Sequence, residues 1–502
     1  MNSNAFFKQH GLDVNPFRAE EARQDMVFDK IEEECRHPDF EKILGDLDRP
    51  SSSVVFGERG SGKTALRMQI EDTVARANAE RTDDRCLVIA YDDFNGLLGR
   101  LSDATGMLDP VDAVPSITLA DHLDGVLGQV VPDLVDAALS SKAPDSGPFA
   151  GIEDIRKRLR AAPRQVRRDL QLLQACHDRS EDAAIRAERL RRSMQSGSRS
   201  RPGGYMFLAI LSASLAGGWS VAVGLGAIRE GFLAWLPAIL LLLGALVAFA
   251  WWARLRMALR STARRLARSI RVSGRDAAGQ AEILRSMNRV RMAEMPWPGA
   301  DSEEDRFRML ERLLGVVRVI GFRGVMVLLD RVDEPVAING NPDLMRAFIW
   351  PLFRNKVLQL DGIGFKFLLP IEVRDCLYRE TPEFFREARL DKQNMVDRLA
   401  WSGAMLYDLC TARMRACTSR GDEANLMDLF AQDVNRQDLV DALDQMHQPR
   451  DAFKLLYGLI QEHCSNVTAE QNDFTISRTV LDLVRKQQVE RREGLIRGSR
   501  PA

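Results

Sequence analysis

The sequence predicts an α/β fold in which a parallel sheet is interrupted by a helical stalk and a membrane hairpin and is followed by a C-terminal helical lid. Three observations support this prediction. A glycine-rich loop, GERGSGKT at 57–64, lies between a β-branched run and a helical pattern. An apolar run at 325–329 ends at Asp330, as a second buried parallel strand would. Two long apolar segments, 205–228 and 232–253, lie between these two motifs.

The glycine loop has the residue types of a phosphate-binding turn. Its glycines let backbone N–H groups face an anion, and a helix that starts near Lys63 adds the positive end of its dipole. Lys63 would reach the β- and γ-phosphates of a nucleotide, and the Thr64 hydroxyl would ligate Mg²⁺. The expected nucleotide-binding residues are Gly57, Gly60, Ser61, Gly62, Lys63, Thr64 and Ala65.

The apolar run at 325–329 would bring carboxylates to the same place. We expect Asp330 to hold Mg²⁺ through water, and either Asp333 or Glu334 to orient a hydrolytic water. The alternative is a buried strand that ends at a solvated acidic turn. The glycine loop elsewhere in the chain favours the catalytic interpretation.

These motifs resemble known ATPases. The apolar run, Asp330, two further residues and then Asp333-Glu334 are similar to the Walker B motif of signal-transduction NTPases with numerous domains (STAND) and of the related KAP and origin-recognition-like ATPases. KAP NTPases carry membrane helices between Walker A and Walker B, so the resemblance implies a P-loop NTPase that binds ATP and Mg²⁺ and hydrolyses ATP. Arg331 stands where the common AAA+ form has glutamate, which leaves Asp333 and Glu334 as alternatives.

Further resemblances concern the two ends of the chain. GLDVNPF at 11–17 looks like the start of secretion-type AAA+ ATPases, which implies that the segment before the glycine loop borders the adenine. QPRDAFKLLYGLIQEH at 448–463 resembles a sensor-2 helix, which implies that Arg450 points at the nucleotide. A surface arginine at a helix start is the alternative for Arg450. Arg374 is either a γ-phosphate or inter-subunit arginine or a surface residue, and Arg398 lies in a segment expected to be helical.

The two apolar segments predict a membrane hairpin. Each has about 22–24 residues, enough to cross a ~30 Å hydrocarbon core. Only Arg229, Glu230 and Gly231 separate them, and arginines are dense on both outer flanks. The positive-inside rule then places both termini in the cytoplasm and the two spans in the inner membrane. A buried helical hairpin in a soluble core is the alternative.

Small residues recur every four positions in the first span, and arginines follow the second. One row is Ser214, Gly218, Ala222 and Gly226, and another is Ala209, Ala213 and Gly217. Such rows let helices approach closely, and the partner is either the second span or another subunit of a homo-oligomer. The stretch 254–271 is rich in arginine and lacks acidic residues, so it suits an anionic leaflet, with nucleic acid as the alternative. A net charge of −1 and the lack of a distinct reading motif argue against nucleic acid as a partner of the whole chain.

The chain is therefore divided into six predicted parts. They are the first half of the ATPase core (1–145), a helical stalk (146–204), the hairpin (205–253), a returning basic stalk (254–298), the second half of the core (299–395) and the helical lid (396–502). Strands are expected at 86–94 and 364–375, and a helix at 117–139. The lid helices are expected to begin at 394.

The sequence favours a membrane-anchored ATPase that acts as a nucleotide-dependent switch, in the signalling or defence setting that the resemblance implies, with a protein partner of unidentified nature. Two alternatives stay open: a secretion-accessory or assembly ATPase, and an ATP-binding membrane scaffold without hydrolysis. The spans carry no charge, which excludes a transport pathway through one copy of the hairpin. Seven cysteines without a CxxC pair are expected to be free thiols.

Overall fold

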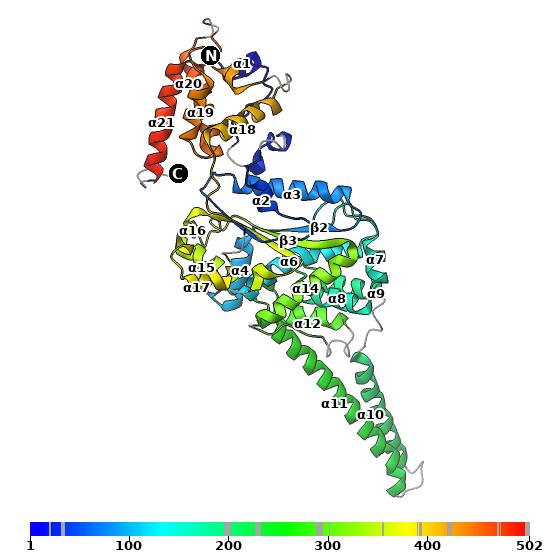
Figure 1. Cartoon of the computed structure of the whole chain (residues 1–502). Coiled ribbons are helices and arrows are strands. Elements are labelled where there is room, and N and C mark those ends of the chain that lie inside the picture. Colours follow the sequence, from blue (N-terminus) through cyan, green and yellow to red (C-terminus); the bar gives the residue numbers. More distant parts are fainter. Residues whose placement is uncertain are drawn as a thin grey trace. The chain divides into compact units, whose positions relative to one another are not determined.

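The fold is that of a computed structural model. It describes residues 1–19, 22–31, 36–194, 202–225, 232–287, 295–300, 302–353, 356–388, 390, 394–418, 424–468, 471 and 473–496. It is a mixed α/β protein with a five-stranded sheet and two long apolar helices (Figure 1). The chain divides into two compact units. Unit 1 contains Met1–Arg81, Met326–Arg346 and Phe353–Ala502, and unit 2 contains Thr82–Val325 and Ala347–Leu352.

The sheet has the strand order β2-β3-β4-β1-β5. Its strands are β1 (Ser53–Gly57), β2 (Arg85–Tyr91), β3 (Phe322–Leu329), β4 (Ile363–Pro370) and β5 (Asn394–Val396). Strand β1 runs parallel to β4 and β5, with Ser53 opposite both Lys366 and Asn394. All residues of β1 and β4 are buried, which is why both strands are mostly apolar, with Ser53 and Lys366 as buried polar exceptions. The expected strands at 86–94, 325–329 and 364–375 are confirmed, but β4 ends at Pro370, where helix α16 (Ile371–Leu377) begins.

Unit 1 surrounds its strands with helices from both ends of the chain. They are α1 (Ser3–Gln9), α2 (Phe40–Leu44), α3 (Lys63–Glu80), α16, α17 (Pro382–Ala388), α18 (Gly403–Ala416), α19 (Arg436–Asp444), α20 (Pro449–Asn466) and α21 (Arg478–Ile496). One apolar cluster joins Phe6 and Phe17 to Leu406 and Leu459. The N-terminal amino group donates a 2.7 Å hydrogen bond to the carbonyl of Cys464. The first residues and the last helices thus share one core.

The lid helix expected to start at 394 does not start there. Residues Asn394–Val396 pair with β1 as strand β5, and the helix α18 begins at Gly403, where the Ser402 side chain accepts a hydrogen bond from the Met405 N–H. Arg398 consequently lies outside any helix. Pairing with a sheet edge overrides the local helical pattern over this short stretch.

Unit 2 contains most of the residues expected to form a stalk. Its helices are α4 (Phe94–Thr105), α5 (Pro110–Ala113), α6 (Leu119–Leu139), α7 (Ile155–Ala161), α8 (Arg164–His177), α9 (Ala183–Ser193), α10 (Pro202–Gly224), α11 (Phe232–Ser269), α12 (Ala277–Ser286) and α14 (Glu303–Ile320), and α15 (Pro342–Phe353) lies at its boundary. Helix α6 is buried along most of its length and contacts α7, α8 and α9. Helix α8 packs against α14, and α12 against α9, through buried residues such as Leu173, Leu190 and Ile283. The described residues of the segments at 146–204 and 254–298 are largely helical, as expected, but α7, α8, α9 and α12 pack into the core of unit 2 and do not form an extended stalk.

Helices α10 and α11 are long and apolar enough to cross a membrane. In their most apolar windows only 17% and 6% of residues are buried, which opposes the alternative of a hairpin buried in a soluble core. They lie side by side (Figure 1). The Trp219 indole N–H donates a 2.8 Å hydrogen bond to the Ala234 carbonyl.

The contact between the two apolar helices uses small residues at seven-residue spacing. Ala209, Ala216 and Val223 are buried on α10, and Ala238 and Ala245 on α11. Of the rows noted in the sequence, only Ala209 is buried, whereas Ala213, Ser214, Gly217 and Gly218 are exposed and Ala222 is partly exposed. Gly226 and the expected turn at 229–231 lie outside the described residues.

Candidate functional site

The glycine loop forms a tight turn between β1 and α3, as the sequence predicts. Gly60 and Gly62 both have φ of +97°, a backbone conformation that side chains with a Cβ rarely adopt. A Cβ on Gly60 would also lie 2.9 Å from Gln448 Oε1 and 3.0 Å from the Cβ of Arg450. Helix α3 then begins at Lys63, so its first N–H groups face the turn.

Lys63 folds back over the loop. Its Nζ donates hydrogen bonds of 2.9 and 3.0 Å to the carbonyls of Gly57 and Glu58. Burial lowers the pKa of Lys63, and the nearby carboxylates of Asp333 and Asp330 oppose that shift. Lys63 is partly exposed and lines a cavity, and the hydrogen bonds given for its ammonium go to carbonyl oxygens, so it is suited to receive an anionic ligand.

Asp330 meets the start of α3. The Thr64 hydroxyl donates a 2.9 Å hydrogen bond to Asp330 Oδ2, and Arg67 Nε lies 3.8 Å from the same oxygen. Asp330 is only 1% exposed. Burial raises its pKa, and the bond from Thr64 and the charge of Arg67 act in the opposite direction. The two expected Mg²⁺ ligands are therefore adjacent.

The two candidate catalytic carboxylates differ in their surroundings. Arg331 has φ of +65°, and this turn after β3 brings its guanidinium 2.5 Å from Glu334. Glu334 is about half exposed and is held by that ion pair. Asp333 is the charged neighbour that raises the pKa of Lys63 most. The turn therefore places Asp333 close to Lys63 and engages Glu334 with Arg331.

Helix α20 supplies Arg450 to the same loop. Pro449 is its first residue, and the Arg450 N–H donates to the Gly60 carbonyl at 3.4 Å. Within the described chain, the buried Nε of Arg450 and the buried hydroxyl of Ser61 have no hydrogen-bond partner. Unpaired buried donors are costly, so they favour an anion at this position.

Glu58, inside the glycine loop, is held by three side chains that sequence reasoning missed. Arg398 forms a 2.5 Å ion pair with Glu58 Oε1, Gln448 donates a 2.6 Å hydrogen bond to Oε2, and Arg492 of α21 lies 3.7 Å away. In the sequence, Arg398 lies 340 positions and Gln448 lies 390 positions from Glu58. No local sequence pattern indicates such contacts.

A cavity of about 190 Å³ opens beside Lys63, Asp330 and Arg450, and all of its lining residues belong to unit 1. A single water molecule needs a cavity of only about 10–15 Å³, so this cavity is large enough for a larger ligand. Its polar lining includes Lys63, Thr64, Asp330, Asp333, Glu334 and Arg450, and Ala65 lines it beside Thr64. Its apolar lining includes Phe28, Ile31, Leu399, Trp401 and Phe453. A ligand with a charged part and a flat apolar part fits this division.

The apolar part of the cavity is built on contacts that the sequence did not reveal. The Trp401 indole N–H donates a 2.9 Å hydrogen bond to the Ser61 carbonyl, and its ring lies 5.1 Å from that of His37. Arg413, 2% exposed, lies over the Phe453 ring and forms a 2.5 Å ion pair with Asp25. Asp25 comes from the segment before the glycine loop, which was expected to border the base.

Comparisons with protein-family models, curated proteins and solved structures find no match. The site is interpreted from its geometry alone. Of the predicted residues, those of the glycine loop, Asp330, Asp333, Glu334 and Arg450 come together. Arg374 does not line the cavity, because it turns to Asp375 and to the Asp397 carbonyl.

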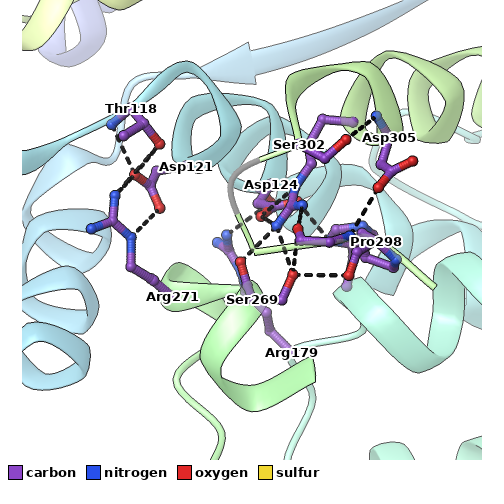
Figure 2. A network of polar contacts seen from close by, with 12 residues as sticks. Thr118, Asp121, Asp124, Arg179, Ser269, Arg271, Pro298, Ser302 and Asp305 are labelled. Carbon is purple, nitrogen blue, oxygen red and sulfur yellow. Dashed lines mark hydrogen bonds and ion pairs between the residues drawn. The ribbon is translucent and has the colours of Figure 1, made fainter. Parts of the chain in front are cut away.

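A second set of charged residues holds the end of α11 within unit 2. Figure 2 shows this network around Asp121, Asp124, Ser269 and Arg271. Arg306, fully buried on α14, donates to Asp124 at 3.1 and 3.2 Å and to the Ser269 carbonyl at 2.6 Å. Arg271 donates to Asp121 at 3.0 Å. We name Asp121, Asp124, Ser269, Arg271 and Arg306 the α11 anchor.

Proposed function

We propose that the chain is a membrane-anchored P-loop ATPase that acts as a nucleotide-dependent switch. The observation that carries this proposal is the 2.9 Å hydrogen bond between Thr64 and Asp330 beside Lys63, at the charged end of one cavity. Residues from two segments of the sequence converge there as the two halves of a nucleotide–magnesium site would. The amphipathic lining of the cavity supports a nucleotide over a simple anion.

Each group has a role in this proposal. Lys63 and the N–H groups at the start of α3 bind the β- and γ-phosphates, and Arg450 adds a positive charge from α20. The Thr64 hydroxyl and the Asp330 carboxylate are oxygen donors of the kind that Mg²⁺ prefers, with water and phosphate oxygens as its other ligands. Bound there, Mg²⁺ neutralises phosphate charge. Asp333 is the better placed group to orient an attacking water, since Glu334 is paired with Arg331.

The switch rests on Glu58. Its loop faces the phosphates, and its side chain is held by Arg398, Gln448 and Arg492, which come from the C-terminal part of the chain. If the glycine loop changes conformation when nucleotide binds or is hydrolysed, the contacts of Glu58 with these three side chains would change as well. In this proposal α10 and α11 cross the inner membrane, both termini lie in the cytoplasm, and the chain works as a homo-oligomer with a protein partner.

The test is binding and hydrolysis of ATP by the full chain in mild detergent. We expect Mg²⁺-dependent ATP binding and slow turnover, with both lost in Lys63→Ala. Asp330→Asn, which keeps the side-chain volume, should lower the affinity for Mg²⁺. Lys157→Ala is the matched control, because Lys157 is 82% exposed and lies outside the cavity. Equal ATP binding by wild type and Lys63→Ala would refute the proposal.

One observation favours a second candidate, an ATP-binding membrane scaffold without hydrolysis. Arg331 follows Asp330 directly and holds Glu334 in an ion pair, so one of the two candidate carboxylates is engaged. The scaffold predicts tight ATP binding with no turnover, unchanged by Asp333→Asn. The ATPase predicts a turnover that falls at least about tenfold in the same variant, the low end of the contribution of such groups.

A further inference from the structure

The part of α11 that follows its apolar stretch has two different faces. Helix α11 is continuous from Phe232 to Ser269, so the apolar and basic parts form one rod. Leu259, Ala263 and Leu266 are buried on one side. At 3.6 residues per turn, the remaining side of the helix carries six exposed arginines. They are Arg254, Arg256, Arg260, Arg264, Arg265 and Arg268.

These six arginines have no acidic partner in the described part of the chain. None of them forms an ion pair, and no acidic residue occurs in the sequence from 232 to 275. The nearby Arg271, by contrast, is held by Asp121. The exposed face is therefore a strip of uncompensated positive charge.

The position of this strip is set by the helix itself. Arg254 directly follows the apolar stretch, and Arg260 and Arg268 lie about 9 and 21 Å further along at ~1.5 Å per residue. Electrostatic attraction falls off over about 8 Å at physiological ionic strength. The first three arginines are therefore within reach of a membrane surface, and the last three are largely screened.

We infer that Arg254, Arg256 and Arg260 bind the phosphate groups of anionic phospholipids in the leaflet that the hairpin enters. This inference rests on the proposed membrane insertion of α10 and α11 and is independent of ATP hydrolysis. Trp252 supports the geometry, because its ring lies 5.1 Å below the Arg256 guanidinium and sits at the boundary of the apolar stretch. Nucleic acid would use all six arginines without regard to their distance from the apolar stretch.

The test compares two variants with equal charge. The proximal variant is R254Q/R256Q/R260Q, and the distal variant is R264Q/R265Q/R268Q. Each is reconstituted as the full chain into phosphatidylcholine vesicles that contain brominated phosphatidylglycerol or brominated phosphatidylcholine. Quenching of tryptophan fluorescence, to which Trp251 and Trp252 contribute at this boundary, gives the relative binding of the two lipids.

We expect wild type to prefer phosphatidylglycerol by about fivefold, the effect of a single arginine near an anionic surface. The preference should fall to about one in the proximal variant and persist in the distal variant. It should also shrink in 1 M salt, where the screening length is about 3 Å. Protease accessibility of the termini checks that both variants keep the wild-type orientation.

Several outcomes would overturn the inference. They are no lipid preference in wild type, an equal loss in both variants, or binding of a DNA duplex that the distal variant alone abolishes. Flotation of the vesicles separates this failure from that of the proposed function. A protein that does not float with vesicles contradicts the membrane hairpin itself, whereas one that floats without lipid preference contradicts only the inference.

Discussion

The Thr64 hydroxyl donates a 2.9 Å hydrogen bond to the carboxylate of Asp330, which lies 266 positions later in the sequence. Asp330 is almost fully buried, so this bond satisfies a group that water does not reach. The same two oxygens are the ones that a magnesium ion would need. The contact satisfies the buried carboxylate, and in the proposed ATPase both oxygens would instead ligate the metal when nucleotide binds.

Replacing this hydroxyl tests both roles. Thr64→Val keeps the side-chain shape but removes one donor from the buried Asp330 carboxylate, so we expect a loss of about 1–3 kcal/mol in the free energy of unfolding. The Mg²⁺ concentration needed for ATP binding should rise at least tenfold. Thr64→Ser, which keeps the hydroxyl, is the control and should stay near wild type in both measurements. Equal Mg²⁺ dependence of the Val and Ser variants would contradict a metal at this position.

Trp401 should report nucleotide binding. It is one of seven tryptophans, lines the cavity and donates to the Ser61 carbonyl in the glycine loop. We expect Mg²⁺–ATP to change the intrinsic fluorescence of wild type, and Trp401→Phe to remove that change. The smaller ring and the lost hydrogen bond to Ser61 should weaken binding about two- to tenfold. Trp350→Phe is the control, because Trp350 is buried elsewhere. A fluorescence change that survives in Trp401→Phe would place the ligand outside this cavity.

The α11 anchor should be sensitive to removal of one charge. Arg306→Met leaves Asp124 buried without its partner, and we expect a loss of about 3–5 kcal/mol, measured by denaturant unfolding in detergent. Arg306→Met combined with Asp124→Asn should recover much of that loss, since no buried charge is left unpaired. Arg271→Gln, at a partly exposed site, should cost only about 1 kcal/mol. Additive losses in the double variant would show that the two side chains do not interact.

The stability of unit 2 should depend on pH through His122. Its ring lies 3.0 Å from the Tyr91 hydroxyl and 2.7 Å from the Phe348 carbonyl, so Nε2 carries the proton and donates to that carbonyl, and burial lowers the pKa of His122 to about 4. In the unfolded chain His122 takes up a proton below pH ~6.5, whereas the buried His122 of the folded protein stays neutral until the pH approaches 4. The contribution of His122 to the free energy of unfolding is therefore fully present above pH ~6.5 and is lost as the pH falls towards 4. The loss is about 2 kcal/mol between pH 7 and 5.

The measurement for His122 is a difference between two proteins. His122→Gln does not titrate, so its unfolding free energy should fall about 2 kcal/mol less than that of wild type between pH 7 and 5. Other buried groups, including Asp124, titrate in both proteins and cancel in the difference. Identical pH profiles of the two proteins would mean that His122 is protonated in the fold.

The sequence predicts what local chemistry determines. A strand, a glycine turn and a helix need only neighbouring residues, and β1, Gly60 and α3 form as expected. The partners of Glu58 lie hundreds of positions away, and nothing near residue 58 indicates them. Leucines at helical spacing in α8 and α9 give an apolar face whether the helix belongs to an extended stalk or to a packed core. The sequence therefore could not distinguish these two arrangements. The three residues of β5 are too few to show a period.

Pairing of β1 with both of its neighbours has a consequence for how the protein is made. Ser52 and Phe365, which meet where β1 joins β4, are separated by 313 positions, and β5 comes later still. At about 5–20 residues per second, the ribosome needs roughly 15–60 s to complete that interval. Throughout this time the buried, mostly apolar β1 lacks both of its neighbouring strands, while the proposed membrane hairpin is synthesised. For the proposed membrane protein, we expect slow or failed membrane targeting to appear first as aggregation of the N-terminal part, because β1 then stays unpaired for longer.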